Sequence, residues 1–158
     1  MGWRGFRSHC CVRVHRVVGV HQPMIRFDVV GHPAPQGSKR HVGKGVMVES
    51  SKRVKPWRAD VKEAALAVAP DQPITGAVAV RFEFRMPVPK SAPKRRRLLA
   101  VRRPDADKLA RSTLDALSGV VFVDDNQIVR LVVEKDLAYD ARPGVSITVW
   151  DLEGADAI

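Results

Sequence analysis

The chain has 158 residues, of which 45% are hydrophobic and 28% charged, values typical of one globular domain. It carries 27 Lys and Arg against 17 Asp and Glu, so its formal net charge is +10 at pH 7. Such an excess of positive charge attracts polyanions and indicates a nucleic-acid partner. No apolar run approaches the roughly 20 residues that cross a bilayer, which argues against a membrane function.

The N-terminal segment differs from the rest of the chain. Residues 1–23 contain four arginines, no acidic residue, and both cysteines, Cys10 and Cys11. The cysteines have no metal-binding spacing, which favours a reducing, cytoplasmic setting. The segment fits a basic arm on DNA, a targeting peptide or a mistaken start upstream of a true translation start at Met24, and we favour the last. We therefore expect a domain over residues 24–152 and a short tail over 153–158.

The first half of this domain alternates between strand and helix patterns. Residues 25–30 are β-branched and alternate, which predicts a strand. Residues 31–45 are interrupted by Gly and Pro and predict a loop, with a short strand possible at 46–49. Apolar residues at helical spacing predict a helix over 57–68. Alternating Val and Phe predict a second long strand over 77–85.

The second half begins with a basic loop over residues 87–104. Residues 105–117 have an apolar stripe and are followed by a glycine, which predicts a helix and its end. Residues 128–134 and 145–149 predict two strands, with a Pro-Gly turn before the second. The order of elements predicts an α+β fold in which two helices pack on one face of a mixed β-sheet.

Acidic residues gather at two element boundaries of this basic chain. Asp105 and Asp107 begin the predicted second helix, and Asp124 and Asp125 precede the next strand. Phosphodiester hydrolysis commonly uses a divalent cation that neutralises the phosphate and activates water. Because Mg²⁺ prefers oxygen ligands, the two clusters together predict a Mg²⁺ site, with Mn²⁺ as a possible substitute.

Each cluster also has a purely structural interpretation. The first pair could stabilise a helix start, and the second pair, followed by Asn126, could form a turn. Arg111 lies one helical turn after Asp107 and could contact a phosphate or simply pair with that carboxylate. A helix that returns the chain toward the same edge would bring the two clusters together, which favours the metal site.

Two longer runs in this region match a known pattern. Residues 104–119 have the sequence PDADKLARSTLDALSG, and residues 121–129 have VFVDDNQIV. These runs resemble the RusA family of Holliday junction resolvases, which are crossover junction endodeoxyribonucleases. Residues 31–40, GHPAPQGSKR, are similar to the proline-rich loop of that family. The resemblance spans residues 25 to 150.

The resemblance implies a homodimer that resolves four-way DNA junctions by paired, symmetric nicks in recombination and repair. It implies Mg²⁺ held by aspartates, and it implies catalytic roles for a small set of residues. The implied ligands are Asp105, Asp107 and Asp125 with Asp124 beside them, and the implied catalytic residues are Asp105, Asp107, Asp125, Arg111 and Lys135. One departure is Arg111, because the best-known member of the family has lysine there. Asp115 also matches the family and suits a structural contact as well as a catalytic one.

The expected DNA-binding residues flank the acidic helix start or lie in the first loop. They are Lys39, Arg40, Lys94, Arg95, Arg96, Arg97, Arg102 and Arg103. Aromatic residues make up only 6% of the chain, which argues against a single-strand binder, and Trp57 is expected in the core. Two alternatives remain open: a non-catalytic nucleic-acid-binding protein and a general metal-dependent DNA nuclease.

Overall fold

The computed structural model describes residues 24–37, 39–41, 47–49, 52–93 and 95–153. The expected N-terminal extension, Lys94 and most of the expected tail lie outside the described residues. In chain order the elements are β1 (Met24–Val30), β2 (Lys39–His41), β3 (Met47–Glu49), α1 (Val54–Leu66), β4 (Val78–Met86), α2 (Ala106–Leu117), the short 3₁₀ helix η1 (Asp125–Gln127), β5 (Ile128–Leu137) and β6 (Gly144–Asp151).

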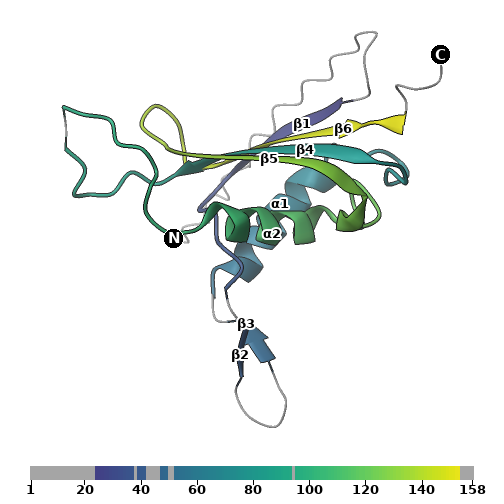
Figure 1. Cartoon of the computed structure of the whole chain (residues 1–158), viewed down its shortest axis with the longest axis horizontal. Helices are drawn as coiled ribbons and strands as arrows, with labels where there is room; N and C mark the ends of the chain where they lie inside the picture. Colours follow the sequence, from purple (N-terminus) through teal and green to yellow (C-terminus); the bar gives the residue numbers. More distant parts are fainter. Residues whose placement is uncertain (1–23, 38, 42–46, 50–51, 94, 154–158) are drawn as a thin grey trace, which may run out of the picture.

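Four strands form the main sheet, in the order β1-β6-β4-β5. β6 is antiparallel to both β1 and β4, whereas β5 is parallel to β4, so the sheet is mixed. Figure 1 shows α1 and α2 together on one face of this sheet, with the β2–β3 hairpin projecting below them. The predicted α+β fold, a mixed sheet with two helices on one face, is confirmed.

The core lies between the sheet and the two helices. α1 contributes Trp57 and Val61, α2 contributes Leu109 and Leu117, and β4 contributes the facing Phe82, all at most 1% exposed. Burial of such large apolar side chains is the main favourable term in folding. Trp57 is therefore a core residue, as expected, and its indole Nε1 donates a 3.3 Å hydrogen bond to Thr113 Oγ1 on α2. The helix that carries the acidic residues is thus held by apolar packing on its inner face.

The opposite face of the sheet is covered by ion pairs rather than by helices. Glu83 on β4 lies 3.6 Å from Arg26 on β1 and 3.4 Å from Arg81, and Arg81 in turn contacts Glu134 on β5 at 2.6 Å. The contact with Glu134, with that carboxylate's charge, raises the pKa of the Arg81 guanidinium. These charges therefore neutralise one another across three strands of the sheet.

The structure extends several predicted elements. α1 begins at Val54 and not at residue 57, because Pro56 falls in the first turn, where a missing backbone N–H is tolerated. The predicted loop 31–45 contains strand β2, which pairs with β3. β5 continues to Leu137, beyond the predicted end at residue 134. No helix in the described part of the chain is long and apolar enough to span a bilayer.

The turn into β6 has room only for glycine. A Cβ built on Gly144 would lie 2.0 Å from the Val29 carbonyl oxygen of the paired strand β1. We therefore expect Gly144→Ala to push β1 and β6 apart and to lower the free energy of unfolding by about 1–3 kcal/mol, the usual cost of overpacking. Urea denaturation measures this loss, and an unchanged midpoint would show that the strands yield without strain.

Candidate active site on helix α2

Helix α2 begins directly at the first acidic pair. Asp105 is the N-cap residue and has an extended backbone, and Asp107 lies in the first turn. The helix ends at Leu117 and is followed by Gly119, whose φ of +74° is a left-handed conformation that glycine adopts without strain. Both predicted limits of this helix are therefore close to those observed, and both acids lie where the sequence indicated.

The outer face of α2 carries a stripe of charge. Asp107, Arg111 and Asp115 are spaced four residues apart, so they lie on one face of the helix, and all three are exposed. Asp115 forms an ion pair with Arg58 of α1. Asp107 and Arg111 have no hydrogen bond or ion pair with any residue that the structure describes. The suggested Asp107–Arg111 pair is therefore not formed, and both groups are available to a ligand.

Asp105 occupies the N-cap position without acting as a side-chain cap. Its carboxylate accepts no hydrogen bond from the backbone N–H groups of the first turn of α2 and instead forms a 3.1 Å ion pair with the side chain of Lys108. The capping interpretation therefore explains the position of Asp105 but not the use of its side chain. Like Asp107, it presents a carboxylate at the exposed start of the helix.

The second acidic pair lies on η1, where the turn interpretation holds for one of its members. The Asp124 carboxylate accepts a 3.3 Å hydrogen bond from the Asn126 backbone, as an N-cap does. Gln127 completes a capping box, because its side-chain oxygen accepts from the Asp124 backbone N–H at 2.8 Å. Its amide nitrogen donates to the carbonyls of Ile74 and Gly76. Gln127 thus anchors the acidic turn to the segment before β4, a role that the sequence analysis missed.

Asp125 is in an unusual electrostatic position for an exposed carboxylate. A side-chain hydrogen bond with Asp124, partial desolvation, and the negative charges of Asp124 and Asp115 raise its pKa, whereas Arg111 lowers it. Two neighbouring carboxylates supply the oxygen ligands that a hard divalent cation prefers. The same interactions place Arg111 within electrostatic reach of η1.

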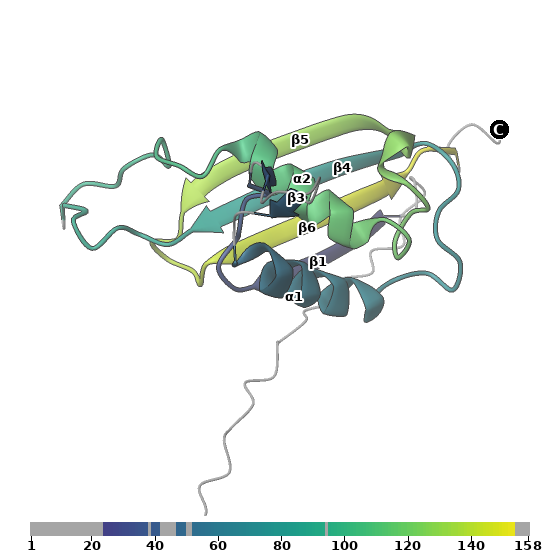
Figure 2. The same cartoon turned by 90° about the horizontal axis from the view of Figure 1, so that it is seen from below.

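The two acidic pairs do not converge within one chain. Asp105 precedes α2 and Asp125 follows it, and a helix of 12 residues rises about 18 Å. Figure 2 shows α2 running along the sheet, with its start near the end of β5 and η1 near the beginning of β5. Among the described residues, no three His, Cys, Asp or Glu side chains are grouped to hold one metal ion. The expectation that the helix returns the chain to the same edge is therefore wrong for a single chain.

Lys135 connects the end of β5 to the start of α2. Its Nζ donates to the carbonyl oxygens of Arg102, at 3.0 Å, and Pro104, at 2.8 Å. Two of its three donors are therefore engaged with the backbone immediately before Asp105, where the Arg103–Pro104 peptide bond is cis. Through these contacts Lys135 positions the segment that ends at Asp105. Its predicted catalytic role stays a prediction.

The predicted DNA-binding residues lie in two projecting segments. Lys39 and Arg40 belong to strand β2, and their side chains lie outside the described residues. The segment between β4 and α2 carries the exposed Arg95, Arg96, Arg97, Arg102 and Arg103. Arg97 forms an ion pair with Asp140 and lies 5.6 Å from the Tyr139 ring centroid. The other four make no ion pair with described residues, so they remain available for phosphate groups.

A basic α+β domain that displays free carboxylates and free arginines belongs, by its chemistry, to the proteins that act on nucleic acids. Comparison with known proteins agrees with this class. The family model described as "Endodeoxyribonuclease RusA" matches residues 30–150. The chain therefore belongs to the RusA endodeoxyribonuclease family, as its sequence motifs indicated. It is also 30% identical over 140 residues to a Bacillus subtilis (strain 168) protein described as "Uncharacterized protein YqaN", covering 81% of this chain and 96% of that protein.

The contacts of Lys135 generate a test of its positioning role. Lys135→Met removes both hydrogen bonds but keeps most of the side-chain volume, so the segment before Asp105 should open more readily. Hydrogen bonds from charged donors contribute about 1.5–3 kcal/mol each at most, and these two are exposed or only partly buried, where water competes, so we expect a combined loss of roughly 1–3 kcal/mol in local stability. Faster hydrogen exchange at residues 105–109 would measure it. Lys62→Met, at an exposed lysine of α1, is the control, and equal exchange in both variants would contradict the tether.

Proposed function

We propose that the protein is a Mg²⁺-dependent endonuclease that resolves four-way DNA junctions as a homodimer, by paired symmetric nicks in recombination and repair. The observation that carries the proposal is the exposed stripe of α2, where Asp107 and Arg111 form no hydrogen bond or ion pair with described residues, in a member of an endodeoxyribonuclease family. Exposed arginines and carboxylates that form no ion pair within the chain are free to bind phosphates and divalent cations, respectively. The substrate also fits the excess of positive charge, and it agrees with the expected cytoplasmic setting.

The carboxylates at the start of α2 and on η1, and Arg111 between them, have separate chemical tasks in this proposal. Asp105, Asp107 and Asp125, with Asp124 beside them, would hold the cation, which Mn²⁺ could replace. A bound Mg²⁺ supplies charge neutralisation at the phosphate and a more acidic attacking water. Arg111 would contact the phosphate and stabilise the negative charge that develops during in-line attack. The products would carry 5′-phosphate and 3′-hydroxyl ends, and a DNA ligase would therefore reseal them.

The loop arginines would hold the arms of the junction. Contacts of Arg95, Arg96, Arg102 and Arg103 with phosphates supply affinity but little sequence information. They release counterions, so binding should weaken steeply as the salt concentration rises. The expected side-chain contacts of Lys39 and Arg40 belong to the same proposal, because their strand β2 lies in the hairpin that projects on the helical side (Figure 1). The arms of the junction would thus lie between the β2–β3 hairpin and the basic segment that precedes α2.

A second copy of the chain would unite the acidic pairs. β5 is an edge strand, and it exposes Val129, Leu131 and Val132, at 67%, 42% and 40%. An apolar edge strand invites pairing with another strand. If two β5 strands pair in antiparallel fashion, the α2 helices that pack beneath them lie side by side and run in opposite directions. Asp107 of one chain then faces Asp125 of the other, so each nicking site is built from both chains.

Removal of one carboxylate tests the activity. Asp107→Asn should lower the rate of cleavage of synthetic four-way junctions in Mg²⁺ by roughly a hundredfold or more, because a metal ligand is lost. Junction binding should remain, since the net positive charge rises. Gel assays with and without Mg²⁺ measure both properties. Asp71→Asn, at an exposed aspartate outside α2 and η1, is the matched control. Full cleavage by Asp107→Asn would show that this carboxylate is not part of the site. Cleavage of linear duplex by the wild type at the rate of junction cleavage would favour a general nuclease.

Mixing of subunits tests the shared site. Asp107→Asn and Asp125→Asn chains should each be inactive, yet their mixed dimers contain one site with both aspartates intact and should recover partial nicking. A mixture of Asp107→Asn chains with chains that carry both substitutions contains no intact shared site and should stay inactive. Recovery is read as nicks in one strand of a labelled junction. Its absence in the first mixture would place all the ligands in one chain and contradict the dimer geometry.

A further inference from the structure

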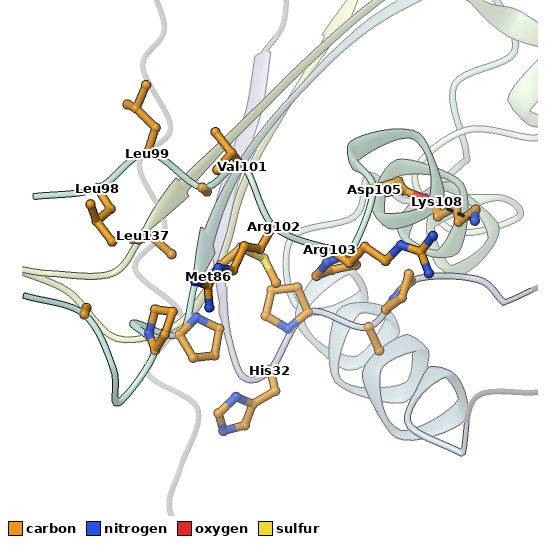
Figure 3. Close-up of a pocket in the computed structure, with 18 of the residues that line it drawn as sticks. His32, Met86, Leu98, Leu99, Val101, Arg102, Arg103, Asp105, Lys108 and Leu137 are labelled. Atoms are coloured by element: carbon orange, nitrogen blue, oxygen red, sulfur yellow. Dashed lines mark ion pairs between the residues drawn. The ribbon is translucent and has the colours of Figure 1, made fainter.

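A cavity of about 800 Å³ opens beside the start of α2. Its lining comes from residues 32–37 after β1, from Met86 and parts of the segment between β4 and α2, from the start of α2, and from Arg53 and Leu137. Figure 3 shows Asp105 and Lys108 at one side of this space and Leu98 and Leu137 at the other, with Met86 between them. Asp105 thus lines the cavity and also belongs to the proposed cleavage site.

The walls of this cavity are fixed by hydrogen bonds. Ser112 Oγ of α2 donates to the Ala34 carbonyl at 2.6 Å, and the Gln36 backbone N–H donates to the Lys108 carbonyl at 2.9 Å. On the other side, Lys135 holds the carbonyls before Asp105, and the Tyr139 hydroxyl accepts from the Leu98 backbone N–H at 2.9 Å. The cavity is therefore a preformed feature, as ligand sites usually are.

The lining combines an apolar interior with a cationic mouth. Met86 is 8% exposed and Leu98 and Leu137 are partly buried, whereas the arginines that line the cavity are exposed. Six cationic side chains line it against one acidic side chain, Asp105; the cations are Arg53, Arg96, Arg97, Arg102, Arg103 and Lys108. A ligand with a flat apolar ring and an anionic backbone is complementary to this arrangement, and that is the chemistry of a nucleotide.

One unpaired polar atom belongs to a residue that lines the cavity. Gln36 lines the cavity, and its side-chain oxygen Oε1 is buried with no hydrogen-bond partner among the described residues. An unpaired acceptor of this kind is costly unless a ligand supplies a donor. The ring and amino N–H groups of nucleobases are such donors. A small rotation of the Gln36 side chain would present this oxygen to a base in the cavity, while the phosphates of the nucleotide stayed at the arginines.

We propose that this cavity receives one unstacked nucleotide of the DNA junction, next to the phosphate that is cut. The inference rests on the proposed function and adds to it a subsite that selects DNA which can release a base. Bases at a branch point unstack at lower cost than bases within a duplex. The base lies against Met86 and Leu137, its edge faces Gln36, and the loop arginines hold the flanking phosphates. The cavity thereby couples recognition of a branch to cleavage at Asp105.

Junctions that carry 2-aminopurine at successive positions near the cut provide the test. The fluorescence of this base rises when it unstacks, and the wild-type protein without divalent metal should raise it at one position only. Ala100→Phe, which fills the cavity, should abolish this rise and slow cleavage about tenfold or more, since base contacts are lost. Ala141→Phe, at an exposed alanine outside the cavity, should behave as the wild type. Gln36→Leu should reduce the preference among the four bases at the unstacked position.

The outcomes separate this subsite from the activity itself. If the wild type cuts no junction, the proposed function fails, but the fluorescence still reports on the cavity. If no position gains fluorescence, or if Ala100→Phe gives the wild-type signal and rate, the nucleotide subsite is overturned. A change of oligomeric state in Ala100→Phe, with unstacking retained, would show that the cavity instead receives a second copy of the chain, which also overturns the inference.

Discussion

The parallel pairing of β4 with β5 is the constraint on which the rest of this structure depends. Two adjacent parallel strands cannot be joined by a tight turn, so the chain must return along the sheet before β5 can start. Helix α2 makes that return, buried on one side by residues such as Leu109 and Leu117. The helix therefore starts beside the end of β5 and finishes beside its beginning. Acidic residues that flank α2 are separated for the same reason.

This constraint explains why single residues connect distant parts of the chain. Lys135, near the end of β5, reaches the carbonyls before Asp105 because the crossover brings that segment beside it. Gln127 performs the corresponding task at the other end, where it joins η1 to the carbonyls of Ile74 and Gly76 before β4. The carboxylates are thus positioned at both ends of one crossover, and a two-fold partner offers a route to bring the two ends together.

The charges of the protein divide into those that are satisfied and those that are free. On the open face of the sheet, Arg81 and Glu83 take part in a row of ion pairs that crosses the strands. On the helical side, Asp107 and Arg111 and most of the arginines before α2 have no ion-pair partner among the described residues. A DNA substrate would meet these free groups, and the apolar cavity beside Asp105 would be within reach of the same strand.

Local patterns in the sequence were enough to predict the mixed α+β fold, the burial of Trp57 and the boundaries of α2, because apolar periodicity and glycine act within a few residues. Spacing also placed Asp107 and Arg111 on one helical face. Only the tertiary structure showed that the second acidic pair lies at the opposite end of α2, that Lys135 binds backbone carbonyls, and that residues 32–37 line a cavity together with residues from the segment before α2. These features depend on the direction of β5 relative to β4 and on contacts between residues far apart in the chain, which no local pattern encodes.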